Sequence, residues 1–294
     1  MKCIVTRYGE IGLKSTWVRR EFEQKLVDNI SACLVENGIE IDKIRQKGAR
    51  NYIFCDNYPK ALKVLKKVFG LVSYSLAEIV DSDLNEICKK AVQIYKKESG
   101  KKAKTFRVTT NRSKDFPMKS MEVSAKVGEY VINETGAKVD LTKYDININI
   151  EIRGKKSYVF VSKERGFGGL PIGSTGKVLS LLSDKNSMLA SWLMMRRGCK
   201  VHLVHFGKKS KELEKMFKQL KNYYYCDEPM ELEYVKEEQS SDKIIDLAKR
   251  TGSEGIVSGT KKLSSVSKEP LPVFRPVLCL DKKNLKQLVA SELL

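Results

Sequence analysis

The second half of the chain alternates apolar strand-like runs with amphipathic helical segments, and this alternation restricts the fold more than any other feature. The predicted strands are residues 177–182, 200–206, 231–234 and 255–258, and the predicted helices are 188–197, 209–224, 243–251 and 282–292. Strands that alternate with helices predict a parallel, doubly wound α/β sheet. A ligand site of such a sheet is expected at the carboxyl ends of its strands.

The first half of the chain follows a different, α+β pattern. Phe22, Leu26, Ile30 and Leu34 recur at helical spacing within 19–37, and Asn37-Gly38 is typical of a helix end. Further predicted helices are 58–68, 83–97 and 121–135, and predicted strands are 3–8, 39–44, 51–55, 105–110, 139–141, 146–153 and 157–162.

A glycine-rich stretch separates the two patterns. Residues 166–173 read GFGGLPIG, which we interpret as an interdomain linker. With a shift in pattern near residue 60, the chain divides into three expected domains, 1–60, 61–168 and 169–294.

The charge of the chain indicates a polyanionic partner. The 55 Lys and Arg residues exceed the 36 Asp and Glu residues, which gives a formal net charge of +19. The excess is largest in 61–173, with 22 basic and 13 acidic residues. Such a surface favours nucleic acid, although a Lys-rich proteome would also produce it. Without a signal peptide or an apolar run of about 18 residues, we expect a cytoplasmic protein that does not bind membranes.

The cysteines and histidines of the sequence do not follow the spacing of a metal site or of a redox CxxC motif. The seven cysteines form no CxxC pair, and His202 and His205 fall three apart on one predicted strand, hence on opposite faces. We therefore predict no metal site and nominate no catalytic residue. Cys226, beside Asp227 and Glu228, is expected to have a disfavoured thiolate.

The loop after the first predicted parallel strand is where a nucleotide would bind. It reads Ser183-Asp184-Lys185-Asn186-Ser187 and contains no glycine, whereas phosphate binding at a helix N-terminus favours glycines that let backbone N–H groups approach. From these residues alone, a turn without a ligand is the favoured interpretation.

Several segments resemble the tRNA 4-thiouridine synthetases, also called tRNA sulfurtransferases. They include RYGEIGLK at 7–14, FGLVSYS at 69–75, FPMKSME at 116–122, IEIRG at 150–154, GLPIG at 169–173, ASWLMMRRGC at 190–199 and FRPV at 274–277. These segments cover nearly the whole chain in the order that the family has.

The resemblance implies an architecture and a chemistry. It implies an N-terminal ferredoxin-like domain and a THUMP domain that bind the tRNA acceptor region. It also implies a C-terminal PP-loop domain that uses ATP to adenylate a uridine oxygen before sulfur displaces AMP. The RNA-binding residues expected from it are Lys14, Arg19, Arg20, Arg107, Arg112 and Lys119. Its nucleotide-binding position falls on Ser183, Asp184, Lys185, Asn186, Ser187 and Gly259.

The sequence also departs from the family pattern. The family's PP-loop reads Ser-Gly-Gly-x-Asp-Ser, and the five residues 183–187 lack both glycines, with Asn186 the nearest match to the aspartate. From the end of the given sequence at Leu294, we expect neither the segment that holds the family's catalytic cysteine nor a rhodanese domain.

From these departures we expect a tRNA-binding protein whose nucleotide-binding domain has lost catalysis. Two alternatives stay open: an active ATP-dependent tRNA sulfurtransferase that makes 4-thiouridine, and an RNA-delivering subunit of a partner enzyme. No cofactor is required by the first reading, whereas ATP and Mg are implied if the loop still functions. A sulfur-donor or catalytic protein partner and a homodimer are likewise left open.

Overall fold

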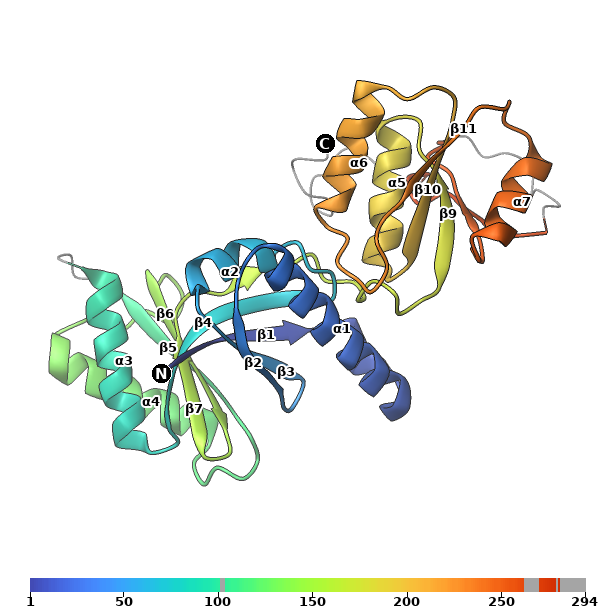
Figure 1. Cartoon of the computed structure of the whole chain (residues 1–294). Coiled ribbons are helices and arrows are strands. Elements are labelled where there is room, and N and C mark those ends of the chain that lie inside the picture. The colour runs from blue at the N-terminus through green and yellow to red at the C-terminus, as the bar shows by residue number, and fades with distance from the viewer. Residues whose placement is uncertain (101–103, 262–269, 279, 281–294) are drawn as a thin grey trace. The chain divides into compact units, whose positions relative to one another are not determined.

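A computed structural model describes residues 1–100, 104–261, 270–278 and 280 of the chain, which is drawn in Figure 1. Contacts between residues divide it into two compact units. The first comprises Met1–Thr6, Asp42–Leu62 and Ser73–Glu164, and the second comprises Arg7–Ile41, Lys63–Val72 and Arg165–Leu294. The helix predicted at 282–292 lies outside the described residues. None of the described helices combines the length and apolar character that a membrane crossing needs.

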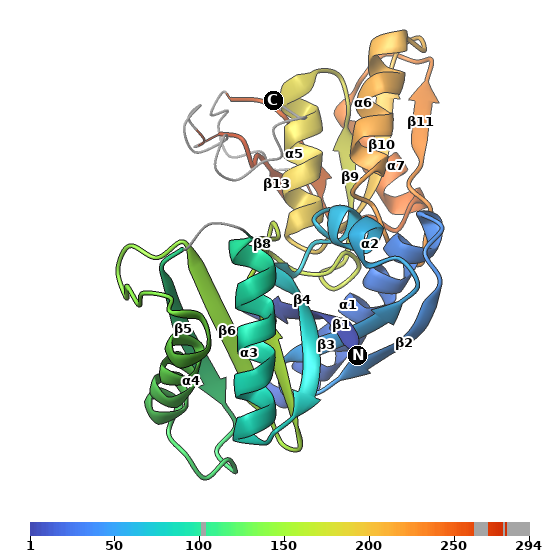
Figure 2. The same cartoon turned by 90° about the vertical axis from the view of Figure 1, so that its left-hand side faces the viewer.

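The first unit is built on one mixed sheet with the order β2-β3-β1-β4-β7-β6-β5, and β8 pairs with β4. Its strands are β1 (Lys2–Tyr8), β2 (Ile41–Gln46), β3 (Arg50–Cys55), β4 (Leu71–Asp81), β5 (Phe106–Arg112), β6 (Ile146–Arg153), β7 (Lys156–Phe160) and β8 (Glu164–Arg165). Helix α2 is Tyr58–Leu65, α3 is Leu84–Ser99 and α4 is Ser120–Thr135. Figure 2 shows α3 and α4 beside β5 and β6, where Ile87, Val127 and Ile148 form a buried core.

Strand β4 was not predicted, and it joins the two halves of this sheet. Its sequence LVSYSLAEIVD mixes serines and alanine with apolar residues, so no clean period-two pattern shows. The strand nevertheless buries Ser73 and Ser75 inside the sheet. The domain boundary expected at residue 60 falls within α2. The strand predicted at 139–141 is reduced to a single bridge between Phe106 and Val139.

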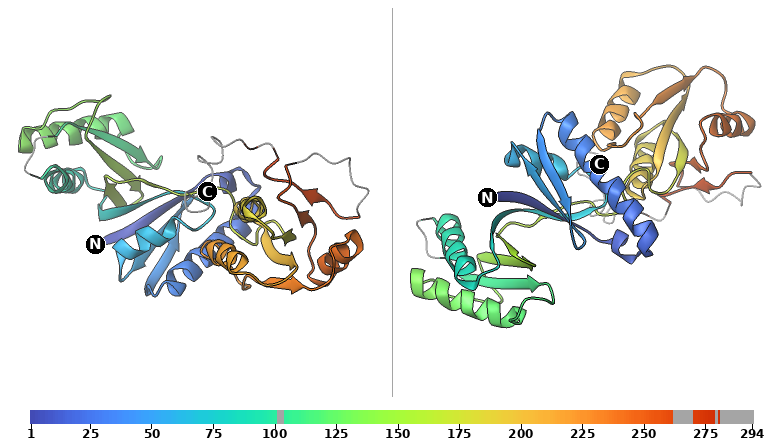
Figure 3. Two further views of the ribbon diagram at one scale, coloured as in Figure 1. Left: turned by 90° about the horizontal axis from the view of Figure 1, so that it is seen from above. Right: turned by 60° about the horizontal axis from the view of Figure 1, so that its bottom comes forward.

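The second unit contains the parallel sheet that the alternating pattern predicts. The order is β11-β10-β9-β12-β13, and each neighbouring pair is parallel. Its strands are β9 (Lys177–Leu181), β10 (Lys200–Phe206), β11 (Leu232–Val235), β12 (Ile256–Val257) and β13 (Val273–Phe274). Helices α5 (Lys185–Arg196) and α6 (Lys211–Lys221) lie on one face, and α7 (Ser241–Arg250) lies on the other (Figure 3). The doubly wound prediction is confirmed.

The N-terminal helix also belongs to this second unit. The short 3₁₀ helix η1 (Glu10–Leu13) leads into α1 (Thr16–Glu36), which buries Phe22, Leu26 and Ile30 as its spacing predicts. The buried Asn29 side chain donates a hydrogen bond to the carbonyl of Ile172 at 3.1 Å. Two ion pairs also join this N-terminal segment to the rest of the second unit: Lys25 with Asp227 at 3.3 Å, and Glu10 with Arg197 at 2.9 Å.

The glycine-rich stretch at 166–173, which we interpret from sequence as an interdomain linker, is held by specific backbone contacts. The amides of Gly166 and Gly168 bond to the carbonyls of Val72 and Leu71, and Leu170 bonds to the carbonyl of Arg196. A Cβ atom at Gly166 would lie 2.1 Å from the Leu71 oxygen, and one at Gly169 would lie 2.1 Å from the Arg196 oxygen. The glycines are therefore required for close backbone approach rather than for flexibility.

An aromatic cluster fills the space around this stretch. The Trp192 ring lies 5.1 Å from Phe69 and 5.2 Å from Phe167, in edge-to-face arrangements, and Tyr223 packs against all three. Such aromatic pairs add stability beyond the area that they bury. The chain thus holds residues 69, 167 and 192 in one packed core, although they are distant in sequence.

We expect Gly169→Ala to destabilise the protein by about 2–5 kcal/mol, because it combines a left-handed φ of +74° with the overlap at Arg196. Gly252→Ala is a matched control, since Gly252 has φ +67° but open space around its Cβ position, and it should cost only about 1–2 kcal/mol. Urea unfolding measures both. Equal losses would contradict the close-approach argument.

Candidate functional site

A pocket of about 450 Å³ lies at the carboxyl ends of β9, β10 and β12. The chain steps from β9 to β10 and β11 in one direction and then returns to place β12 on the other side of β9, so the strand order reverses at this point. Open α/β sheets bind their ligands at such a reversal. The lining residues are Leu181, Leu182, Ser183, Asp184, Asn186, Val204, His205, Phe206, Gln239, Ser258, Gly259, Thr260 and Lys261.

The loop between β9 and α5 is closed by its own hydrogen bonds. Asp184 caps α5, and its carboxylate accepts from the amide of Ser187 at 2.8 Å. The Ser187 hydroxyl in turn accepts from the amides of Ser183 and Asp184, at 2.8 and 2.9 Å, and donates to the Asp184 carbonyl. Three backbone donors that could otherwise meet a phosphate are thereby satisfied within the loop.

Gly259 forms the opposite wall of this loop and has a steric reason to be glycine. A Cβ atom there would lie 2.3 Å from the Ser187 amide nitrogen and 2.6 Å from its Cα. The strand end after β12 therefore touches the first turn of α5 directly. The structure thus brings Gly259 together with 183–187, as the site assignment from sequence expected, although Lys185 is exposed and is not among the residues lining the pocket.

His205 is oriented by the backbone of the same region. Its Nδ1 lies 2.8 Å from the Leu182 carbonyl, which can only accept, so Nδ1 donates a hydrogen bond to it. Asp184 brings a negative charge and Lys261 a positive charge to the described lining of the pocket. Across the described residues, no three His, Cys, Asp or Glu side chains are grouped to hold a metal ion.

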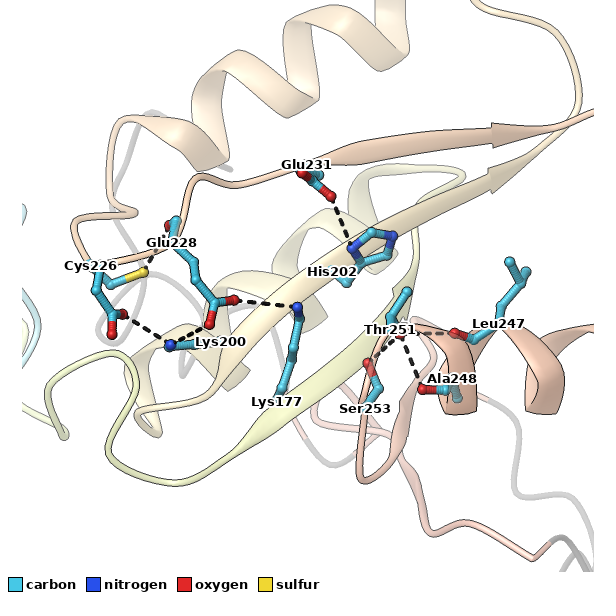
Figure 4. A network of polar contacts seen from close by, with 11 residues as sticks. Lys177, Lys200, His202, Cys226, Glu228, Glu231, Leu247, Ala248, Thr251 and Ser253 are labelled. Carbon is cyan, nitrogen blue, oxygen red and sulfur yellow. Dashed lines mark hydrogen bonds and ion pairs between the residues drawn. The ribbon is translucent and has the colours of Figure 1, made fainter.

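A polar network at the other end of the strands is structural (Figure 4). Lys177 and Lys200 begin β9 and β10, and both pair with Glu228, at 3.3 and 2.7 Å. The hydrogen bond from Lys200 lowers the pKa of the Glu228 carboxyl. The Cys226 thiol donates to the Glu228 carbonyl at 3.1 Å, and burial is the main cause of its raised pKa. The direction expected for Cys226 is confirmed, but burial rather than the neighbouring carboxylates dominates.

The basic residues expected near the N-terminus differ in their availability. Arg19 donates to Glu23 at 2.8 Å and to the Tyr8 hydroxyl at 2.9 Å, so its guanidinium is engaged in a local cluster. Burial, with the hydrogen bond to Glu23, raises the pKa of Tyr8 to about 12. Lys14 and Arg20 are exposed to solvent.

Arg107 and Arg112 lie on opposite faces of β5, because they are five residues apart on a strand. The Arg107 guanidinium stacks on the Tyr144 ring at 4.0 Å. Arg112 donates through Nη1 to the carbonyls of Ser113, Lys114 and Phe116, and so holds the loop after β5. Lys119 is exposed at the N-cap of α4. Arg107 and Arg112 therefore do not form one contact surface, and no pattern in the sequence predicts the stacking of Arg107 on Tyr144.

A larger hollow, of about 700 Å³, lies between α4 and β5 but does not suit a phosphate ligand. Its lining is mainly apolar, with Phe106, Val108, Met121 and Ile132, and the one charged side chain is Glu129. Because none of these lining residues is a cation, the hollow is not a candidate contact for RNA phosphates.

Comparison with known proteins decides the family. Three family descriptions match the chain: "ThiI ferredoxin-like domain" over residues 3–75, "THUMP domain" over 81–162 and "Thiamine biosynthesis protein (ThiI)" over 173–249. A relative from Thermococcus kodakarensis named "Probable tRNA sulfurtransferase" is 38% identical, with 96% of this chain and 85% of that protein covered. The chain belongs to the tRNA sulfurtransferase family.

Other members and solved structures agree. A relative of the same name from Methanocaldococcus jannaschii is 41% identical over 90% of this chain and 68% of its own length. The crystal structure of PH1313 from Pyrococcus horikoshii is similar with a TM-score of 0.87, at 37% identity and 98% coverage of both chains. A 4-thiouridine synthetase solved with RNA and bound ATP shares the fold, with a TM-score of 0.78 at 23% identity, over 100% of this chain and 86% of that one.

These findings confirm the expected fold class of this tRNA sulfurtransferase family member: ferredoxin-like and THUMP domains followed by an α/β PP-loop domain. The loop at 183–187, where the sequence resemblance predicts the nucleotide-binding position, lies within the matched residues 173–249.

Ser187→Ala should lower the free energy of unfolding by about 1–3 kcal/mol, because the buried Ser187 hydroxyl makes three hydrogen bonds that hold the loop, two from the amides of Ser183 and Asp184 and one to the Asp184 carbonyl. The control is Ser240→Ala, which removes the cap of α7 and a single contact of 3.4 Å to Lys243. Chemical denaturation should show a larger loss for Ser187→Ala. A loss no greater than that of the control would mean that the loop is not held by this hydroxyl.

Proposed function

We propose that this protein binds tRNA and that its C-terminal domain does not turn over ATP. The single observation that carries the second part is the closed hydrogen bonding of the loop at 183–187, with the Asp184 carboxylate on the pocket side. A carboxylate beside the α5 N-terminus repels the polyphosphate that a PP-loop would bind, and it occupies a donor that phosphate would need.

Family membership and charge support tRNA binding. The relatives are named as tRNA sulfurtransferases, and a structural neighbour is a 4-thiouridine synthetase in complex with RNA. Lys and Arg side chains that neutralise phosphates release counterions from RNA, and the net charge of +19 therefore favours RNA binding. We place the contacts in the acceptor region of tRNA and retain Lys14, Arg20, Arg107 and Lys119 as direct contacts, with Arg112 positioning its loop.

We also retain the division into 1–60, 61–168 and 169–294 as the functional one: a ferredoxin-like part, the THUMP part that grips RNA, and the PP-loop part. A protein of this kind would deliver tRNA to a partner that donates sulfur or carries out the chemistry. A homodimer is compatible with the same role.

A second function is favoured by one specific observation, the pocket itself. Its position at the strand-order reversal, and the close approach of Gly259 to α5, are features that nucleotide binding uses. An active ATP-dependent tRNA sulfurtransferase, with Mg and a sulfur donor on another chain, is therefore the alternative.

The two functions differ in nucleotide turnover. Incubated with ATP, Mg²⁺ and a tRNA transcript, the protein should release no AMP above the level without enzyme. The Thermococcus kodakarensis relative, assayed in parallel, controls the conditions. Thermal unfolding with ATP gives a second readout, because a ligand at 100 times its Kd stabilises by about 2.7 kcal/mol. AMP release that depends on tRNA would overturn the first function and establish the second.

Lys119→Ala should weaken tRNA binding at every salt concentration tested and reduce the slope of log K against log salt by about 1, as loss of one phosphate contact requires. Lys89→Ala is the matched control, since Lys89 is an exposed lysine of the same unit that pairs with Glu86 and is not among the expected contacts. Filter binding across a salt series measures both. An unchanged slope for Lys119→Ala would remove Lys119 from the interface.

A further inference from the structure

The start of α1 exposes two large apolar side chains that the proposed function does not use. Trp17 is 75% exposed and Leu13 is 89% exposed, and their Cα atoms, four residues apart along the chain, are separated by at most about 14 Å. The other tryptophan, Trp192, is fully buried. Isolated exposed leucines are common, but a largely exposed tryptophan is informative because this side chain is usually well buried or bound to a partner.

Charged side chains surround these two residues. Lys14 and Arg20 are exposed, and Arg20 lies one helical turn after Trp17, on a neighbouring position of the surface. Arg19 is engaged by Tyr8 and Glu23, and Glu21 is exposed on the turn that follows Trp17. Two cations against one carboxylate leave a modest positive charge, so charge alone would give weak binding.

The size of the apolar surface distinguishes between kinds of partner. A stable protein interface uses roughly 20–30 residues on each side, with few charges at its centre. One tryptophan and one leucine between charged side chains do not reach that size. A single indole ring does match the area of a nucleobase, and proteins that bind single-stranded RNA stack bases on aromatic rings while cations hold the adjacent phosphates.

We propose that Trp17 stacks on an unpaired nucleobase of RNA, with Leu13 extending the apolar platform and with Lys14 and Arg20 binding the flanking phosphates. This inference rests on the proposed RNA binding, and it adds a site that recognises an unpaired nucleotide rather than a duplex. The contact requires no other part of the second unit to move, because Leu13 and Trp17 are already exposed.

Intrinsic fluorescence tests the stacking directly, since the chain has two tryptophans and Trp192 is buried. A single-stranded oligoadenylate of about eight nucleotides should quench the emission of Trp17, whereas a blunt RNA duplex of equal length should not. Trp17→Phe should abolish the change, which assigns it to this residue. Absence of quenching by single-stranded RNA, or equal quenching by the duplex, would overturn the proposal.

Affinity gives a second readout. Trp17→Ala should weaken binding of the oligoadenylate by about 5- to 150-fold with little change in the salt slope, and Trp17→Phe should retain part of the affinity. Met121→Ala is the control, because Met121 is 84% exposed and lies in the other unit. Equal affinities for Trp17→Ala and Met121→Ala would overturn the stacking role.

The outcomes separate this inference from the proposed function. If the wild-type protein binds tRNA and Lys119→Ala weakens that binding, while Trp17→Ala binds oligoadenylate as the wild type does, only the stacking site fails. If the wild-type protein binds neither tRNA nor oligoadenylate, both fail. Unfolding midpoints of the Trp17 variants should equal that of the wild type, since the side chain is exposed.

Discussion

The close backbone contact made by residues 166–173 is the constraint on which the second unit depends. Gly166 and Gly168 bond to the chain at 71–72, and Leu170 bonds to the end of α5 through Arg196. Neither approach leaves room for a Cβ atom at Gly166 or Gly169. These contacts place Phe69 and Phe167 against Trp192, and thus connect the N-terminal segment to the core beneath the parallel sheet. The glycines therefore determine how these segments pack.

A helix N-terminus has a limited number of unsatisfied N–H groups, and they cannot serve a cap and a phosphate at once. At the start of α5 the Asp184 carboxylate satisfies the amide of Ser187, and the buried Ser187 hydroxyl satisfies the amides of Ser183 and Asp184 in the preceding loop. Stability of the loop and affinity for a polyphosphate are therefore opposed at this position. The pocket that remains combines the geometry of a switch-point site with the electrostatics of a self-capped helix.

Much of the fold follows from local pattern. The spacing of Phe22, Leu26 and Ile30 predicts the buried face of α1, and the strand–helix alternation predicts the parallel sheet with helices on both faces. Strand β4 escaped prediction because its serines are buried only through pairing with distant strands, which no local pattern encodes. The close approaches at Gly166 and Gly169 could not be predicted either, since the carbonyls that these glycines meet belong to distant segments of the chain.

The site was less predictable than the fold because side-chain availability depends on tertiary partners. Sequence places Arg19, Arg20, Arg107 and Arg112 on equal terms as cations. The structure shows that Arg19 is held by Tyr8 and Glu23, and that Arg112 is held by three carbonyls. Counting charges therefore overestimates the number of free phosphate contacts.

Uncharged surface also matters for RNA binding, because not all of the predicted cations are free to contact phosphate. The start of α1 has a small net charge, yet it exposes the aromatic ring of Trp17, which cannot contribute to phosphate binding. Counterion release gives affinity for any RNA strand, whereas stacking requires a base that is not already paired. A protein that uses both cations and a stacking ring binds a folded RNA with an unpaired segment more tightly than a uniform duplex. The preference comes from the ring, because the cations contact only the backbone. In this chain, discrimination would then depend more on Trp17 than on the excess of lysine.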